Sequence, residues 1–316
     1  MLAPTPIAGI DVGKHFLDLG FEPAARARRV TNDAAGIAAL IAALRGRGAA
    51  RVALEAIGPY AWPVTAALVA AGFEVRLADP RQVRAFRTAE GRIAKTDRLD
   101  AGLIARFAGA MPQRLRPAPE PQTLALKALS TRRRQLVELV AMEKTRLGQA
   151  FDATIAEGHR IVIAALEAAC KEIEARLDAA IAADPALVRR REILVSIPGV
   201  GPRIAGILIA DMPELGALDR KAAASLAGLA PHPDQSGRLP GRNAISGGRP
   251  CLTAAFYMAG MVAARCDPRF RAAYRALRDA GKPPKVAIIA TGRRLATIAN
   301  ALIREDITFE KSRFAA

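Results

Sequence analysis

The chain has 316 residues, enough for two or three domains, and carries 47 Lys and Arg against 30 Asp and Glu, a formal net charge of +17. This surplus favours a polyanionic partner such as nucleic acid over a general compositional bias towards Arg. Three cysteines without C-x-x-C spacing argue against a disulfide framework and a structural zinc site, and the 4% of aromatic residues leaves little material for base-stacking platforms.

The N-terminal sequence "MLAPTPIAGI" lacks the basic and long apolar regions of a signal peptide. No window approaches the ~18 uninterrupted apolar residues of a membrane span. We therefore expect a soluble, cytoplasmic protein with no membrane partner.

The first part of the chain predicts a mixed sheet. Short apolar runs predict strands, and helical periodicity between them predicts helices. In chain order we expect strands at 7–13, 15–22 and 26–32, a helix at 33–48, a strand at 51–56, a helix at 60–72 and a strand at 73–79. A meander followed by helix, strand, helix and strand predicts an α/β domain over 1–115.

A Pro-rich stretch at 111–122 marks a boundary, because residues before prolines resist helix formation. Beyond it, 122–184 predicts nearly continuous helix with a break near 156–160, and we expect a helical arm over 116–188. The second part of this arm carries a narrow apolar seam formed by Leu166, Cys170, Ile173, Leu177 and Ala180. Such a seam suits a coiled-coil partner in another chain or packing on the first part of the arm.

The last part of the chain, 189–316, predicts an α-helical domain. It opens with "ILVSIPGVGPRIAGILIADM" and shows helical stretches around 250–265, 268–280 and 284–304. It contains turn sequences but no convincing strands.

Four acidic residues form a candidate metal site. Asp11 and Glu55 end apolar strands, where an ionised carboxylate is costly unless it is paired or bound to metal. Asp97 and Asp100 lie three residues apart, on one face of a predicted helix. Oxygen ligands suit Mg²⁺, and a divalent ion would relieve the repulsion among the acids. The simpler interpretation is that Thr96 or Asp97 caps the helix and that an acid favours its first turn.

Several blocks together resemble the DEDD transposases of the insertion-sequence-110 family. They are "IAGIDVGKHFLDL", "LEAIGPYAWPV", "DPRQVRAFRTAEGRIAKTDRLDAGLIARFA", "SIPGVGPRIAGILIADM", "GLAPHPDQSGRLPGRNAISGGRP" and "GKPPKVAIIATGRRL", and the resemblance runs essentially end to end. It implies an RNase H-like (RuvC-like) domain in which Asp11, Glu55, Asp97 and Asp100 bind Mg²⁺, with Mn²⁺ as a substitute. It also implies a bacterial, nucleoid-associated enzyme that cuts and rejoins donor and target double-stranded DNA.

The same resemblance gives Ser246 a role that the sequence alone does not. From the residues, a serine before Gly247-Gly248 is ordinary turn chemistry, and Arg249 could hold a phosphate. The resemblance implies that this serine attacks DNA and forms a covalent phosphoserine. It further implies a noncoding guide RNA and a homo-oligomer, a dimer or tetramer, in which different subunits supply the two half-sites.

Further residues are predicted to contact nucleic acid. The turn at Gly199 and Gly201 resembles a helix-hairpin-helix and could present backbone N–H groups to a phosphate, although it could also simply connect two helices. The full set is Lys14, Lys95, Arg98, Gly199, Gly201, Arg203, Arg242, Arg249 and Lys285.

Three other functions remain open. A RuvC-like hydrolytic nuclease shares the carboxylates but has no use for Ser246. An actin- or sugar-kinase-like ATPase also begins with a "GIDVG"-type strand and turn, but it needs a second glycine-rich phosphate loop, which we do not find. A nucleic-acid-binding protein without catalysis would not need the acids at all.

Overall fold

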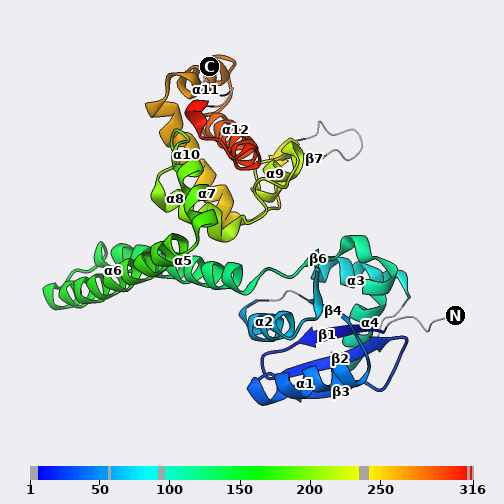
Figure 1. Ribbon diagram of the computed structural model, residues 1–316. Coiled ribbons are helices and arrows are strands. Elements are labelled where there is room, and N and C mark those ends of the chain that lie inside the picture. Colours follow the sequence, from blue (N-terminus) through cyan, green and yellow to red (C-terminus); the bar gives the residue numbers. More distant parts are fainter. Residues whose placement is uncertain (1–5, 56–57, 92–96, 235–241, 312–313, 315–316) are drawn as a thin grey trace. The chain divides into compact units, whose positions relative to one another are not determined.

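The computed structural model describes residues 6–55, 58–91, 97–234, 242–311 and 314 (Figure 1). Within these ranges, the side chains at 59, 97–99, 232–234, 242–244 and 311 are not described. The chain divides into two compact units, Met1–Leu124 and Ala125–Ala316.

The N-terminal unit contains a mixed sheet with the order β3-β2-β1-β4-β5-β6. Its strands are β1 (Ile7–Val12), β2 (Phe16–Glu22), β3 (Arg28–Thr31), β4 (Arg51–Glu55), β5 (Glu74–Ala78) and β6 (Arg116–Pro117). The first three form an antiparallel meander, β4 and β5 run parallel to β1, and β6 is an antiparallel edge. This arrangement confirms the predicted RNase H-like α/β domain.

Helices cover both faces of this sheet. They are α1 (Ala34–Gly46), α2 (Trp62–Ala70), α3 (Pro80–Ala89) and α4 (Asp97–Ala110), with short 3-10 turns at Pro59–Ala61 and Pro112–Arg114. Alternate residues of β1 such as Ile10 pack with α1 and α2 on one face. On the other face, Ala53 and Ala78 pack with α3 and α4. Helix α3 was not among the predicted elements; Asp79 caps it and Pro80 begins it.

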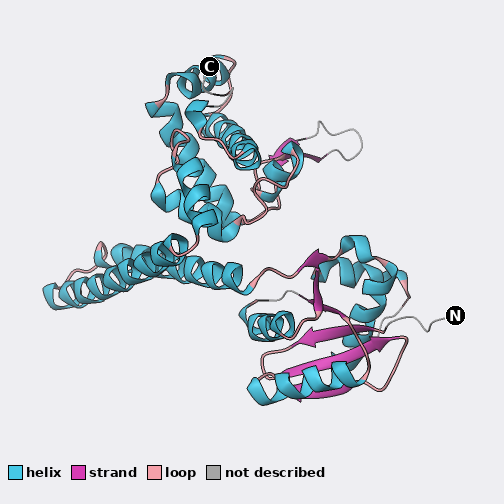
Figure 2. Ribbon diagram, in the orientation of Figure 1, coloured by secondary structure: helices cyan, strands magenta, loops and turns pink. Residues whose placement is uncertain are grey.

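The second unit is mainly helical (Figure 2). Its helices are α5 (Pro121–Leu147), which begins in the N-terminal unit, α6 (Ala153–Ala182), α7 (Pro185–Val195), α8 (Pro202–Asp211), α9 (Arg220–Leu226), α10 (Pro250–Cys266), α11 (Pro268–Asp279) and α12 (Pro284–Glu305), followed by a 3-10 turn at Phe309–Lys311. The core lies where α7, α8, α10 and α12 meet, around Leu208, Phe256 and Leu295.

Two predictions for this unit were wrong. The segment 189–316 contains a hairpin of β7 (Pro231–Asp234) and β8 (Arg242–Ile245). Each strand has only four residues and β7 contains two prolines, so the sequence did not indicate strands here. The break in the arm lies at 148–152 and not at 156–160. Asp152 accepts hydrogen bonds from the backbone N–H groups of Thr154 and Ile155, so α6 begins directly after it.

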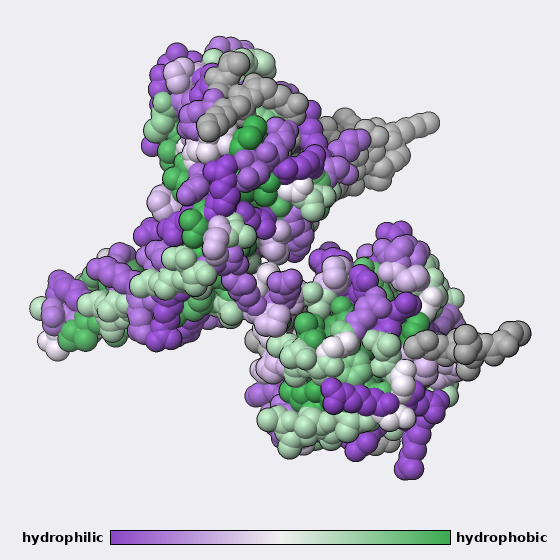
Figure 3. Space-filling model, in the orientation of Figure 1, coloured by the Kyte–Doolittle hydropathy of each residue, from purple (hydrophilic) through white to green (hydrophobic). Residues whose placement is uncertain are grey.

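The two long helices of the arm pair within the chain. Arg133 Nε lies 2.6 Å from a Glu174 oxygen, and Lys144 Nζ lies 2.7 Å from a Glu167 oxygen. In the apolar seam, Leu177 is buried and the other four residues are partly buried. Figure 3 shows apolar surface on the arm. The exposed apolar residues of α5, α6 and the turn between them are Val137, Leu139, Met142, Phe151, Ile155, Ile161 and Val162.

By length and composition, α12 alone among the described helices could cross a membrane. Half of its most apolar window is buried inside the protein, where Leu295, Ala299 and Leu302 are part of the core. Its apolar character is therefore explained by its place in that core.

Candidate active site

Three acidic residues form a row across the sheet. Asp18 of β2 lies opposite Asp11 of β1 in the antiparallel register. Glu55 is the next residue after the Ile10–Leu54 pair in the parallel register of β1 and β4. Opposed residues point to the same face, so all three side chains lie on the face that α4 covers.

Two glycines allow α4 to lie directly on this face. A Cβ atom on Gly9 would lie 2.1 Å from the carbonyl oxygen of Ala101, and one on Gly20 would lie 2.5 Å from the amide nitrogen of Gly102. This close approach fixes the first turns of α4 against β1 and β2. Asp100, which precedes Ala101, is thereby held beside the end of β1.

The structure brings three of the four predicted acids within electrostatic reach of one another. The pKa of Glu55 is raised to about 7, first because the carboxyl is partly buried and then because Asp11 and Asp100 are negatively charged; Arg87 and Arg84 of α3 oppose the shift. Asp97 begins α4 one turn before Asp100, but its side chain lies outside the described residues.

Two arginines pair with acids at this site. Arg87 Nη2 lies 2.5 Å from Asp100 Oδ1, and both side chains are mostly buried. Arg29 binds Asp18 through two hydrogen bonds, of 2.9 and 2.8 Å. Neither pair was predicted from the sequence, although the alternation of "FLDLGFE" places Asp18 on the same face as Asp11 once the register is known.

The donor set fits a divalent cation by its chemistry, since carboxylates from β1, β4 and α4 converge on one end of the sheet. Among the side chains that the structure describes, no three His, Cys, Asp or Glu are close enough together to hold a metal ion. Asp100 faces Arg87 instead. Metal binding would therefore require Asp100 to exchange this arginine for the ion.

Ser246 lies in the second unit, directly after β8, and is exposed. Gly247 and Gly248, with φ of 73° and 69°, carry the chain from the hairpin into α10. A Cβ on Gly248 would lie 2.3 Å from the amide nitrogen of Gly228, so this segment lies tightly against the turn after α9. The exposed serine thus lies two residues before a close backbone contact.

Arg249 anchors the end of this segment. Its guanidinium donates to both carboxylate oxygens of Glu214, at 2.8 and 2.5 Å, and to the carbonyl oxygen of Asp211 at 2.6 Å. Its amide nitrogen donates to the carbonyl oxygen of Leu226. These contacts give Arg249 a positioning role beside its predicted role in phosphate binding.

No described group of the second unit is hydrogen-bonded to the Ser246 hydroxyl. His159 lies on the arm, where its Nδ1 is 2.7 Å from Glu143. His15 lies in the exposed turn between β1 and β2, and the side chain of His232 is not described. The described part of this unit therefore shows no base already hydrogen-bonded to Ser246.

The other predicted nucleic-acid residues are spread over both units. Lys14 is exposed after β1, and Lys285 is exposed in the first turn of α12. Gly199 turns inward, because a Cβ there would lie 2.3 Å from the Ala259 carbonyl oxygen of α10. Gly201 caps α8 and is exposed, as is Arg203, whose Nε is 3.3 Å from Glu174. Lys95 and the side chains of Arg98 and Arg242 lie outside the described residues.

Comparisons with known proteins find matches in both halves of the chain. The family model DEDD_Tnp_IS110, described as "Transposase", matches residues 8–155, and "Transposase IS116/IS110/IS902 family" matches 191–275. A "Pilin gene-inverting protein" of Moraxella bovis is 29% identical over 266 residues, which is 82% of this chain and 81% of that protein. An IS110 "uncharacterized 43.6 kDa protein" of Streptomyces coelicolor is 31% identical over 58% of this chain and 50% of that protein.

Among solved structures, RuvC of T. thermophilus in complex with a Holliday junction substrate covers 36% of this chain and 99% of its own. The identity is 19% and the TM-score 0.30, so the strand order, and not this likeness, supports the fold. The first family model covers the carboxylate-bearing N-terminal unit and the beginning of the helical unit, and the second covers the part of the helical unit that contains Ser246. The chain therefore belongs to the IS110 family of DEDD transposases.

Proposed function

We propose that this transposase cuts and rejoins DNA through a covalent intermediate on Ser246, with Asp11, Glu55, Asp97 and Asp100 as ligands of Mg²⁺, for which Mn²⁺ can substitute. The observation that carries the proposal is the convergence of Asp11, Glu55 and Asp100 at one end of the sheet, in a chain that also displays an exposed serine beside a tightly packed turn. The cation, when bound, supplies Lewis-acid stabilisation of the charge that develops on phosphate oxygens.

The serine step exchanges one ester bond for another. A bond forms between the Ser246 oxygen and phosphorus, the bond from phosphorus to a deoxyribose oxygen breaks, and the proton lost by the serine ends on the released hydroxyl. A second DNA hydroxyl then attacks the phosphoserine and regenerates Ser246. Because bond energy is kept in the ester, the strand can be rejoined without another energy source.

The charge and the relatives agree with this scheme. A net charge of +17 favours binding to DNA phosphates. The printed name of the Moraxella bovis relative speaks of inverting a gene, and an inversion requires that cut strands be joined again. We extend the proposal to a cytoplasmic, nucleoid-associated homo-oligomer, a dimer or tetramer, that acts on donor and target duplexes with a noncoding guide RNA.

The test is to trap the covalent intermediate. End-labelled DNA carrying the terminus of the element is incubated with the protein and Mg²⁺, and the products are separated under denaturing conditions. We expect a labelled protein–DNA adduct that Ser246→Ala abolishes. Thr154→Ala, which removes an exposed hydroxyl from the arm, should leave the adduct unchanged.

The hydrolytic alternative gives the opposite pattern. If Ser246→Ala protein nicks the same DNA at the unaltered rate and no adduct is found with either protein, the chain is a RuvC-like nuclease and the proposal fails.

A further inference from the structure

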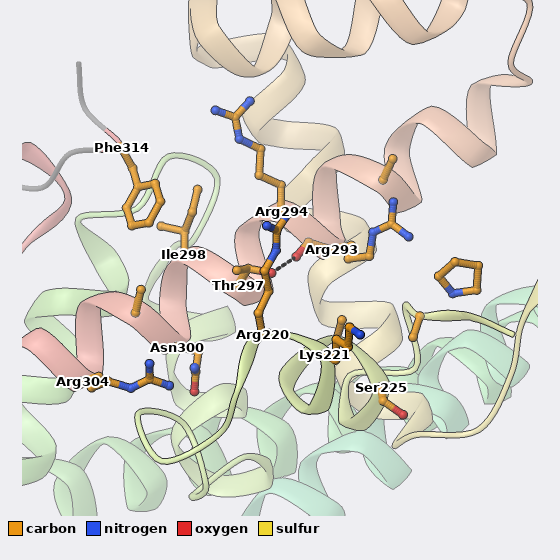
Figure 4. A pocket seen from close by; sticks show the side chains of 15 residues that line it. Arg220, Lys221, Ser225, Arg293, Arg294, Thr297, Ile298, Asn300, Arg304 and Phe314 are labelled. Carbon is orange, nitrogen blue, oxygen red and sulfur yellow. Dashed lines mark hydrogen bonds between the residues drawn. The ribbon is translucent and has the colours of Figure 1, made fainter.

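A groove with a volume of about 930 Å³ lies between α9 and α12 of the second unit (Figure 4). Its lining includes Arg220 and Lys221 at the start of α9, and Arg293, Arg294 and Arg304 along α12. None of the described residues that line it is acidic. The groove is therefore strongly positive.

Among the described residues, none of these five cations forms an ion pair. Arg294 stacks over the ring of Phe270, with 5.4 Å between the guanidinium carbon and the centroid. Arg304 donates to the backbone carbonyl oxygens of Gly216 and Leu218, which holds its side chain in place but leaves its charge uncompensated.

The spacing along α12 suits an extended anion. Arg293 and Arg304 are eleven residues apart, which in an α-helix puts them within about 20° of the same face and about 16 Å apart along the axis. Thr297 and Asn300 line the groove between them. One strand of duplex DNA carries a phosphate about every 3.4 Å of helix axis, so this face spans roughly five phosphates.

The groove adjoins the segment that carries Ser246. Pro231 lines the groove and pairs with Ile245 in the β7–β8 hairpin, and Ile245 directly precedes Ser246. Ser225 also lines the groove, and its carbonyl oxygen lies 2.7 Å from the position that a Cβ on Gly248 would take. A strand held in the groove would thus run close to the serine.

We propose that this groove binds the phosphate backbone of a nucleic-acid duplex and leads it to Ser246. The second part of this statement rests on the proposed function of the serine, whereas the first part does not. The groove recognises a row of phosphodiester groups, which both DNA and RNA carry. The position beside Ser246 favours the DNA strand that is cut.

The experiment measures binding to DNA and RNA duplexes of arbitrary sequence over a series of salt concentrations, in full-length protein that also carries Ser246→Ala. Contacts to phosphates release counterions, so the logarithm of the binding constant falls with the logarithm of salt concentration by about 0.9 per phosphate contacted in B-DNA. We expect Arg220→Ala with Lys221→Ala to make this slope less steep by roughly 1 to 2. Both side chains are exposed, so the fold should survive.

Two controls separate the groove from overall charge. Lys171→Ala with Arg275→Ala removes two exposed cations from α6 and α11, outside the groove, and should leave the slope unchanged. Arg220→Lys with Lys221→Arg keeps the charge and should keep the slope. If Arg220→Ala with Lys221→Ala changes the slope only for the RNA duplex, the groove binds RNA and not the DNA strand at Ser246.

The proposal is overturned if adding Arg220→Ala and Lys221→Ala to the Ser246→Ala protein leaves the slope unchanged for both nucleic acids. That result is expected if the groove instead binds an acidic protein. Because Ser246 is absent from every protein compared, the result does not depend on the covalent chemistry. Failure of the groove and failure of the serine mechanism are therefore separate outcomes.

Discussion

At the scale of single residues, the acidic side chains near the end of β1 repel one another: they are Asp11, Asp18, Glu55 and Asp100. The folded protein compensates this repulsion only in part. Arg29 neutralises Asp18, and Arg87 neutralises Asp100. Glu55 keeps a pKa of about 7 because it is partly buried beside Asp11 and Asp100. Its charge therefore costs stability near neutral pH until a cation compensates it.

The first prediction concerns the pH dependence of stability. The unfolded chain releases the Glu55 proton near 4.5 and the folded protein near 7, so the free energy of unfolding falls as pH rises through this range. After allowance for partial exposure to solvent, we expect a loss of about 1 to 2 kcal/mol that Glu55→Gln avoids. Denaturant unfolding of both proteins in metal-free buffer at pH 4.5 and pH 8 measures the difference.

Addition of Mg²⁺ at pH 8 serves as the control for this prediction. It should recover the lost stability in the unaltered protein and have a smaller effect in Glu55→Gln. Parallel pH profiles for the two proteins without metal would contradict the assignment.

The second prediction concerns Arg249. If this residue acts by fixing the Ser246 segment through Glu214, then Arg249→Ala and Glu214→Ala should each reduce adduct formation and lower stability, by about 1 to 3 kcal/mol for a pair that is only partly buried. The double variant should lose little more than either single one. A double-mutant cycle on stability and on adduct formation measures this.

The other role gives a different result. If Arg249 instead binds phosphate, Glu214→Ala should leave DNA affinity unchanged, while Arg249→Ala makes the salt dependence of binding less steep.

Much of the candidate site could be predicted from single residues, because an acid at the end of an apolar strand is conspicuous. Asp11 and Glu55 stood out in this way. Arg87 did not, since its pairing with Asp100 depends on how α3 packs beside α4, which no periodicity records. Ser246 followed from the family resemblance, because a serine before two glycines is common in turns.

At the scale of elements, the site depends on the contact between α4 and the sheet. Gly9 and Gly20 let the helix backbone touch β1 and β2, and this contact sets the position of Asp100 relative to Asp11. A single methyl group in that contact would push the helix away from the sheet.

The third prediction follows from this contact. Gly9→Ala should destabilise the protein by about 1 to 3 kcal/mol, because its Cβ would overlap the Ala101 carbonyl oxygen. It should also reduce Mg²⁺-dependent adduct formation at temperatures where the protein remains folded. Thermal unfolding and the adduct assay on the same preparation measure both effects.

Gly158→Ala provides the matched control. Nothing lies within 4 Å of a Cβ at this position in α6, so the change should stabilise the helix by about 0.5 to 1 kcal/mol and leave the adduct unaffected. An active Gly9→Ala protein of normal stability would contradict the role of the contact.

Elements with clear hydrophobic patterns could be predicted, and those defined by local capping or pairing could not. Strands β1, β2, β4 and β5 alternate or form apolar runs. The hairpin of β7 and β8 contains Pro231 and Pro233, and its pairing depends on register. The break in the arm follows the cap at Asp152 and not the glycine at 158.

At the scale of the whole molecule, the acids and Ser246 belong to different compact units. The structure divides at Leu124, and the three-part division at 115 and 188 stays a prediction.

The fourth prediction concerns subunits. If different chains supply the two half-sites, mixing Asp100→Asn with Ser246→Ala protein should restore part of the adduct formation that each lacks alone. No restoration after co-refolding would favour a site built within one chain.

The central claim is that the carboxylates and the serine act in one reaction. It is tested most directly by asking whether Asp100→Asn protein, which keeps Ser246, forms the covalent adduct with labelled DNA in Mg²⁺. We predict that the adduct is lost while thermal stability and duplex binding are retained. An adduct formed at the unaltered rate by Asp100→Asn protein would show that the serine works without the carboxylates, and would contradict this account.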